Sequence, residues 1–188
     1  MTRKIHDTDY LFLTTRVRAL EGCLLNRGQM EQMLEAGSPE EAARILTDCG
    51  YPELETVSAI TVGEMLNRER ERLFQDLAEL VPDPAILAVF QLPHDNHNVK
   101  VLLKSEAMVI QEDRLLVDAG RIPSKQLVAA LRSGEVQNLP PQLGEAIDEA
   151  RQVLSATRDP QLGDMVLDRR YFQELLVLAE ETGSLFLQ

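Results

Sequence analysis

Apolar residues recur at intervals of three or four along most of the chain, with polar residues between them. This spacing places the apolar side chains on one face of a helix. A clear case lies between residues 9 and 25, where the apolar positions are Leu13, Val17, Leu20 and Leu24. A second lies between residues 61 and 80, where the charged stretch NRERER supplies the polar face. Both segments are predicted to be amphipathic helices.

Capping signals set several of the predicted helix ends. Ser38 precedes Pro39 and stands three residues before Glu41, which is the pattern of a capped helix start. Thr61 and Glu64 have the same spacing and predict the start of the long second helix. Each helix should therefore begin close to a residue whose side chain binds free backbone amides.

Proline residues predict two further boundaries. Asp83 and Pro84 predict the start of a short helix, and Pro93 predicts its end, because proline removes a hydrogen bond from a helix interior. A separate helix is then expected from Asp95 to about Ile110. The other predicted helices cover residues 29–36, a segment starting at 39, and residues 124–131, 143–154 and 168–181.

Signals for β-structure are absent from the sequence. No run of β-branched or aromatic residues alternates with polar ones, and no Asn-Gly turn occurs. Aromatic residues make up only 4% of the chain and there is no Trp, whereas the strong helix formers Leu, Glu, Ala and Arg are abundant. The sequence therefore predicts an all-α fold.

Two pairs of segments resemble each other in the same order along the chain. RVRAL at residues 16–20 resembles NVKVL at 98–102, and LFQDLAEL at 73–80 resembles YFQELLVL at 171–178. Two ordered matches indicate a repeated helical unit. The predicted division is a first unit at residues 1–92, a second at 93–165, and the start of a third, incomplete unit at 166–188.

The predicted third unit stops early. A core helix follows the segment LFQDLAEL, whereas the chain ends before such a helix can follow YFQELLVL. We therefore expect Gln188 to be a cut within a longer protein. We also expect the helix at 168–181 to expose apolar surface that its missing partner would cover.

The charge of the chain narrows the choice of partners. The formal net charge is −12, and no run of Lys or Arg is longer than two. Such a chain is repelled by phosphate backbones, so nucleic acid is not expected as a partner. No apolar run reaches the roughly 18–20 residues of a membrane-spanning helix, so direct membrane insertion is not expected either.

Cysteine usage and the N-terminal sequence bear on location. Cys23 and Cys49 lack the spacing of a CxxC pair, and the N-terminus lacks the apolar core of a signal peptide. We expect two reduced thiols and a cytoplasmic protein.

The segment HDNHNVKVLLK, residues 94–104, holds the best metal candidates. They are His94, Asp95 and His97. A mononuclear site normally needs ligands from more than one segment, and the only other histidine is His6. A metal-dependent hydrolase using these three residues is therefore the weakest of the alternatives.

A structural role suits the same segment better. Asp95 or Asn96 can cap the helix that is expected to follow Pro93. His97 and Asn98 are then expected to form hydrogen bonds with neighbouring helices.

Sequence motifs of catalysis are missing. The chain contains no GxSxG, P-loop, GxGxxG or HExxH pattern, and its many carboxylates are typical of a solvated acidic face. We expect no catalytic residue and no cofactor, and therefore a function in binding.

The stretch TTRVRALEGCLLNRGQMEQMLEAGSPEEAARILTDCGYPE resembles the opening of the C (or d) subunit of rotary A-type and V-type ATPases. The second such helix of that family begins Asp-aromatic-His-Asn-apolar-Lys-x-Leu-Leu-Lys. The matching residues here are Asp95, His97, Asn98, Val99, Lys100, Leu102, Leu103 and Lys104, with Asn96 in place of the aromatic residue. LDRRYFQELLVLAEETGS resembles the family's entry into its third helical unit, so the resemblance covers essentially the whole chain.

The resemblance implies a non-enzymatic rotor part that binds no nucleotide. Members of that family are all-helical funnels of three similar units. The funnel receives the end of the central shaft, made of D-type and F-type subunits, and its other face rests on the membrane proteolipid ring. The family thereby couples H+ or Na+ transport to ATP synthesis or hydrolysis, and this chain would be peripheral to the membrane through that complex. It would hold two units of the funnel and the start of a third.

Two groups of site residues follow. The expected structural motif is Asp95, His97, Asn98, Leu102 and Leu103. The expected partner contacts are Arg16, Arg18, Lys100 and Lys104; the spacing of four puts the two lysines on one helix face, which can meet a cavity or an acidic partner. The alternative function is a helical-repeat adaptor that presents a concave surface to an unrelated protein.

Overall fold

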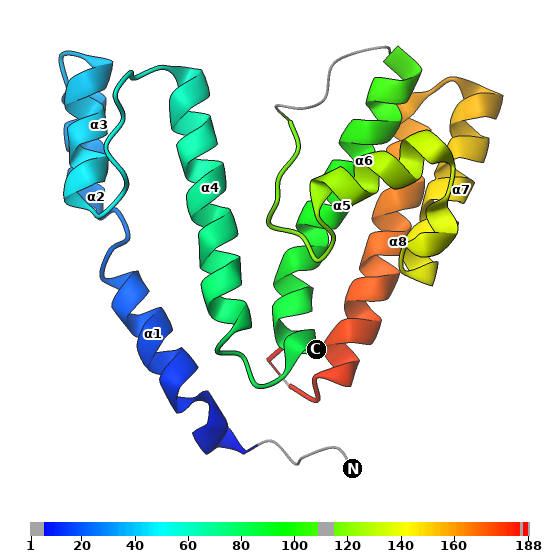
Figure 1. Ribbon diagram of the computed structural model, residues 1–188, viewed down its shortest axis with the longest axis horizontal. Coiled ribbons are helices and arrows are strands. Elements are labelled where there is room, and N and C mark those ends of the chain that lie inside the picture. Colours follow the sequence, from blue (N-terminus) through cyan, green and yellow to red (C-terminus); the bar gives the residue numbers. More distant parts are fainter. Residues whose placement is uncertain (1–5, 109–114, 185, 188) are drawn as a thin grey trace. The chain divides into compact units, whose positions relative to one another are not determined.

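The computed structural model describes residues 6–108, 115–184 and 186–187. Within these ranges every regular element is a helix (Figure 1). The prediction of an all-α fold is confirmed. The chain divides into two compact units, Met1–Pro82 and Asp83–Gln188, called unit 1 and unit 2 below.

Unit 1 contains one 3-10 helix and four α-helices. They are η1 (Asp7–Tyr10), α1 (Leu11–Glu21), α2 (Arg27–Glu35), α3 (Pro39–Asp48) and α4 (Ala59–Ala78). α2 and α3 pack side by side as a pair (Figure 1). Leu46 and Met65 are the only buried apolar side chains among the described residues of this unit. Unit 1 therefore has almost no core of its own.

The helix starts of unit 1 follow the capping signals with local shifts. The Ser38 hydroxyl accepts from the Glu41 amide at 3.2 Å, as predicted, but the Glu41 carboxylate accepts from the amide of Gly37 at 2.8 Å. α4 begins earlier than predicted, because Ser58 and Thr61 form the capping box. Each of these two side chains accepts from the other's backbone amide, which satisfies two free donors of the first turn.

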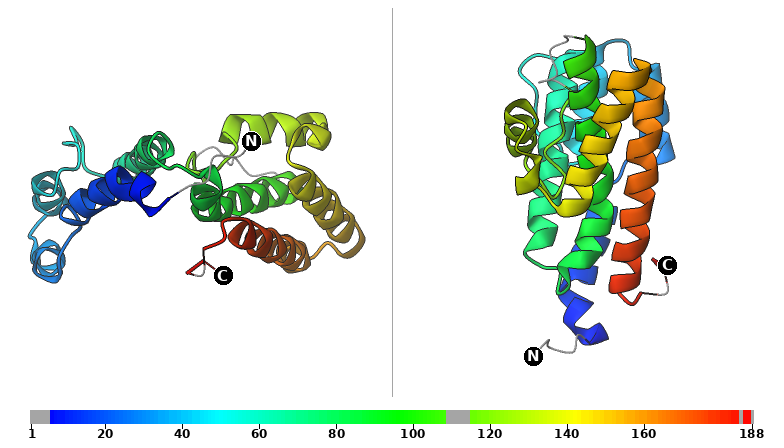
Figure 2. Two further views of the ribbon diagram at one scale, coloured as in Figure 1. Left: turned by 90° about the horizontal axis from the view of Figure 1, so that it is seen from below. Right: turned by 90° about the vertical axis from the view of Figure 1, so that its right-hand side faces the viewer.

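Unit 2 contains four α-helices and one 3-10 helix. They are α5 (Pro84–Met108), α6 (Ser124–Ser133), η2 (Val136–Asn138), α7 (Pro141–Thr157) and α8 (Pro160–Glu181). α8 packs against both α5 and α7. α6 and α8 lie on opposite sides of α5 (Figure 2). A continuous core joins these elements; its most deeply buried members include Val99, Leu103, Leu127, Ile147, Ala150 and Leu167.

The prediction of two helices separated at Pro93 was wrong. α5 runs without a break from Pro84 to Met108 and contains Pro93 in its interior. Pro93 lies on the exposed side of α5, so water can bind the carbonyl that loses its partner. Side-chain packing on either side of Pro93 then outweighs one missing hydrogen bond. The predicted end at Ile110 lies outside the described residues.

The last helix is also longer than predicted. α8 begins at Pro160 because Asp159 caps it by accepting from the Gln161 amide at 2.9 Å. Gly163 does not break the helix but lies directly against Leu154 of α7, where a side chain would not fit without movement. The turn between α7 and α8 is therefore tight.

The predicted three-unit division stays a prediction. Its boundaries at 92/93 and 165/166 fall inside α5 and α8, whereas the compact units divide at Pro82 and Asp83.

None of the described helices is long and apolar enough to cross a membrane.

Candidate functional site

The segment 94–104 lies on α5 and faces the loop before α6 as well as α8. Asp95 is fully buried. Its Oδ2 accepts from Nε of Arg121 at 2.7 Å, and its Oδ1 accepts from the amide of Ile122 at 3.2 Å. Arg121 also donates through Nη1 to Glu174 of α8 at 2.7 Å. One guanidinium therefore links α5 to α8.

Burial sets the electrostatics of this Asp95–Arg121–Glu174 cluster. Burial raises the pKa of Asp95, while the hydrogen bond and positive charge of Arg121 oppose that shift. Burial alone would lower the pKa of Arg121, but its hydrogen bonds to Glu174 and Asp95 outweigh this and raise it. Arg121 is thus held as a cation between two acids. Its Nη2 is buried and has no hydrogen-bond partner among the described residues.

The predicted helix-capping role of Asp95 and Asn96 was wrong, because both residues lie inside α5. Asp95 instead binds the loop before α6. Asn96 donates through Nδ2 to Asp168 of α8 at 3.1 Å. Both side chains therefore hold α5 to other parts of unit 2.

Asn98 and His97 bind the backbone that precedes α6. Asn98 is fully buried and pairs with both backbone groups of Val117: its Nδ2 donates to the carbonyl at 2.8 Å, and its Oδ1 accepts from the amide at 2.9 Å. His97 Nε2 lies 2.9 Å from the carbonyl oxygen of Leu115. The partners of both side chains belong to a loop and not to the neighbouring helices that were predicted.

Lys100 and Lys104 form ion pairs with α8. Nζ of Lys100 lies 2.6 Å from Oδ1 of Asp168, and Nζ of Lys104 lies 2.6 Å from Oδ2 of Asp164. Burial alone would raise the pKa of Asp168, but hydrogen bonds from Lys100 and Asn96 outweigh it and lower that pKa. The contact of these lysines with a partner stays a prediction. Any such partner would meet lysines that are already paired with Asp168 and Asp164.

The apolar residues of the segment form part of the core. Leu102 and Leu103 are 4% and 2% exposed, and Val99 is fully buried. Polar and apolar residues of this segment therefore act together, because its apolar side chains fill the core of unit 2 while its polar side chains fix the loop and α8 around it.

A second ionic cluster joins α7 to α8. Glu149 of α7 accepts from Arg170 of α8 at 2.8 Å and also pairs with Arg169. The hydrogen bond from Arg170 lowers the pKa of Glu149, and the charges of both arginines add to that shift. This cluster fixes the register of the two helices along their surface.

Arg16 and Arg18 lie on α1 in unit 1. Arg16 pairs with Asp76 of α4 at 3.2 Å, and Arg18 pairs with Glu21 one turn further along α1 at 2.8 Å. Arg18 is 75% exposed. Contact of either arginine with a partner protein remains a prediction.

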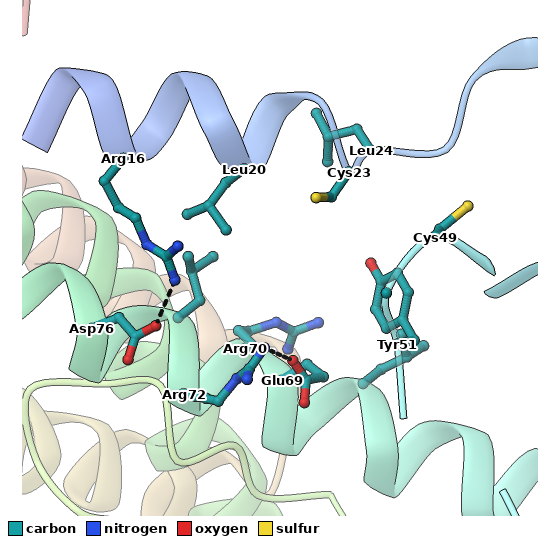
Figure 3. A pocket seen from close by; sticks show the side chains of 13 residues that line it. Arg16, Leu20, Cys23, Leu24, Cys49, Tyr51, Glu69, Arg70, Arg72 and Asp76 are labelled. Carbon is teal, nitrogen blue, oxygen red and sulfur yellow. Dashed lines mark hydrogen bonds and ion pairs between the residues drawn. The ribbon is translucent and has the colours of Figure 1, made fainter. Parts of the chain in front are cut away.

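Unit 1 has an open groove between α1 and α4 (Figure 3). Its volume is about 390 Å³. Arg16 and Leu20 point from α1 toward α4, which presents Asp76 and Arg72 to them (Figure 3). Cys23, Cys49 and Tyr51 line the groove beyond Leu20.

Asp95 and His97, two of the three metal candidates, contact other groups of the protein. Both carboxylate oxygens of Asp95 accept hydrogen bonds, and the ring of His97 lies against the Leu115 carbonyl. In the described ranges, no three His, Cys, Asp or Glu side chains are grouped to hold a metal ion.

Several residues that complete the site were not predicted. Arg121, Asp168 and Gly120 contact the 94–104 segment from distant parts of the chain, and Glu174 is linked to it through Arg121. The only local signal was Asp95 itself, since a carboxylate on a helix face between apolar residues needs a cation or amide donors. Nothing in the sequence identified which of the 19 Lys and Arg residues supplies it.

The sequence resembles known proteins over most of its length. The family described as ATP synthase (C/AC39) subunit matches residues 13–187. The C subunit of the V-type sodium ATPase of Enterococcus hirae is 28% identical over 176 residues, which are 93% of this chain and 54% of that protein. The C subunit of the A-type ATP synthase of Methanocaldococcus jannaschii is 26% identical over 129 residues, 63% of this chain and 32% of that protein.

The chain therefore spans about half the length of the Enterococcus relative and a third of the Methanocaldococcus relative. The family match includes α1, the 94–104 segment on α5, and α8. The expected resemblance to the C subunit of rotary ATPases is confirmed, and the chain belongs to the ATP synthase (C/AC39) subunit family.

Proposed function

We propose that the chain is a non-catalytic part of the central rotor of a V-type or A-type ATP synthase. In this role it acts as a socket between the central shaft and the membrane proteolipid ring, peripheral to the membrane on the cytoplasmic side. The observation that carries the proposal is the family match over residues 13–187. The names of both relatives, which are subunits of a V-type sodium ATPase and of an A-type ATP synthase, support it.

The fixed geometry of unit 2 suits a part that transmits torque. A coupling element must resist shear between its helices. Four polar links tie α5 to α8, through Arg121, Asn96, Lys100 and Lys104. The Asp95–Arg121 pair, whose carboxylate is fully buried, is weak evidence for net stability but holds α5 and the loop before α6 in one geometry.

The proposal is tested by binding to purified shaft proteins. The full chain, immobilised on a biosensor, is titrated with the complex of D-type and F-type subunits and, separately, with detergent-solubilised proteolipid ring. We expect saturable binding to both, with dissociation constants of about 1 μM or tighter. The purified chain alone should not hydrolyse ATP.

Arg18 provides a variant with a matched control. Arg18→Glu should weaken shaft binding by about tenfold, because a rim charge changes from attraction to repulsion. Arg27→Glu is the control, since Arg27 on α2 is also exposed and also pairs with a glutamate on its own helix. An equal loss of shaft affinity in both variants would show that Arg18 is not a specific contact of the shaft. Absence of binding to shaft and ring would leave the adaptor function as the better one.

A further inference from the structure

The groove of unit 1 is built from two helix faces. On α1, Arg16 and Leu20 stand four residues apart, and Leu24 follows just beyond the end of that helix. On α4, Leu66 and Leu73 stand two turns apart. Leu24, Leu66 and Leu73 are 68%, 38% and 37% exposed.

The apolar floor of this groove is uncovered in a unit that has little core. Only Leu46 and Met65 are buried apolar residues in the described part of unit 1. α1 and α4 are held together by the Arg16–Asp76 ion pair, whose side chains are 43% and 41% exposed. Exposed ion pairs contribute little to stability, about 0–1 kcal/mol. The two helices therefore leave room between them for a third element.

Charge at the groove differs from that of the chain as a whole. The net charge of the protein is −12, yet three arginines line the groove: Arg16, Arg70 and Arg72. The two acids beside them are already used, since Asp76 pairs with Arg16 and Glu69 pairs with Arg72 at 2.7 Å. Arg70 has no hydrogen bond or ion pair with another described residue. It presents a free guanidinium next to Leu66 and Leu73.

We propose that the groove binds an amphipathic α-helix of a partner protein, with leucine-sized side chains on one face and a carboxylate on its flank. The apolar face covers Leu20, Leu24, Leu66 and Leu73, and the carboxylate pairs with Arg70. A helix satisfies its own backbone hydrogen bonds, so it can enter a groove whose walls are side chains. The proposal rests on the side chains of the groove itself and does not depend on the socket proposed above.

The test uses the full chain with a fluorescent reporter in the groove. Cys23 is exposed and lines the groove, so a polarity-sensitive maleimide dye on Cys23 in the Cys49→Ser variant reports on its occupancy. The probe is a synthetic helical peptide of about 18 residues with leucine at helical spacing and glutamate on one flank. A second peptide carries lysine in place of each glutamate.

We expect saturable binding of the glutamate peptide and clearly weaker binding of the lysine peptide. Arg70→Glu should weaken the glutamate peptide by about tenfold and reverse the preference between the two peptides. Arg68→Glu is the matched control and should change neither, because Arg68 is exposed on α4 but does not line the groove. Leu73→Asp should abolish binding while the circular dichroism spectrum of the chain stays helical.

Three outcomes would overturn the proposal. One is the absence of saturable binding by the glutamate peptide. Another is an equal effect of Arg68→Glu and Arg70→Glu on peptide affinity, because the peptide would then respond to the overall charge of the chain and not to Arg70. The third is a dimer in sedimentation equilibrium that Leu73→Asp converts to a monomer, because the occupant would then be a second copy of this chain.

Discussion

At the scale of single residues, the buried charge of Asp95 dictates its surroundings. A carboxylate without exposed surface needs donors, and Arg121 and the Ile122 amide supply them. Removing one partner of a buried ion pair typically costs about 3–5 kcal/mol, because the other charge is left buried alone. Gly120 precedes Arg121 and lies directly against Asp95, so the loop can approach α5 only without a side chain at that position.

Gly120→Ala should destabilise unit 2 by about 1–3 kcal/mol, because overpacking forces a displacement at a filled site. A Cβ at residue 120 would lie 3.1 Å from Cγ of Asp95 and 3.3 Å from its backbone nitrogen, and would also collide with Oδ1. Asp95 cannot turn away without losing Arg121. Urea-induced unfolding, followed by circular dichroism, measures the change.

A double-mutant cycle with Asp95→Ala separates this clash from other effects. In the Asp95→Ala background the carboxylate is absent, so Gly120→Ala should cost clearly less than in the native chain. Equal costs in both backgrounds would show that the alanine disturbs the loop in some other way.

At the scale of elements, the contact between α5 and α8 combines apolar packing with paired charges. Val99 and Leu103 of α5 belong to the same core cluster as Val166 and Leu167 of α8. At the edge of this contact, Asp168 receives both Lys100 and Asn96. The packing supplies most of the stability, since a half-exposed ion pair contributes less than about 1 kcal/mol. The charges select the register in which the helices meet.

The lowered pKa of Asp168 predicts a dependence of stability on pH. A carboxylate whose pKa is lower in the folded state stabilises the fold above its ordinary value of 3.8 and loses that contribution as the pH falls through the folded value. Asp168→Asn should therefore be less stable than the native chain near neutral pH. The difference should shrink as the pH falls below 3.8.

Urea-induced unfolding of both proteins at a series of pH values measures this difference. Lys100→Gln removes the other half of the pair. Its free energy of unfolding should also lie below that of the native chain near neutral pH, and this difference should also shrink as the pH falls below 3.8. A difference in the free energy of unfolding that stays constant from neutral to acid pH would contradict the assigned role of the ion pair.

At the scale of the whole molecule, apolar burial is very uneven. Unit 2 holds twenty of the buried apolar residues described, whereas unit 1 holds Leu46 and Met65. Folding of a small domain depends on the apolar area it removes from water, which must offset the conformational entropy of the chain. Unit 2 meets this requirement within its own residues. Unit 1 leaves two amphipathic helices facing an open groove.

The two units should therefore differ when they are produced separately. A fragment of residues 83–188 should be helical and unfold in one cooperative transition, and a fragment of residues 1–82 should unfold gradually, without a clear baseline. Thermal circular dichroism measures both. A sharp transition of the 1–82 fragment, at a midpoint equal to that of the 83–188 fragment, would contradict the uneven distribution of stability.

The accuracy of sequence-based prediction follows the range of the interactions involved. Ser38 was correctly predicted as a helix cap, because capping involves residues a few positions apart. Pro93 was misjudged because its local preference was outweighed by packing on both sides of it. Asp159 was an overlooked cap, although it stands immediately before a proline in the usual way.

The sequence by itself determined that the protein is all-α, because helical periodicity and capping are local patterns. The sequence also identified the family, because motifs of that family occur in the expected order along the chain. Only the tertiary structure decided that Asp95 meets Arg121, that Asn98 meets Val117, and that Lys100 meets Asp168. These partners stand 19 to 68 residues apart. Local conformational preference cannot tell which of several distant residues with similar side chains will be the partner. That choice is made only when the helices pack.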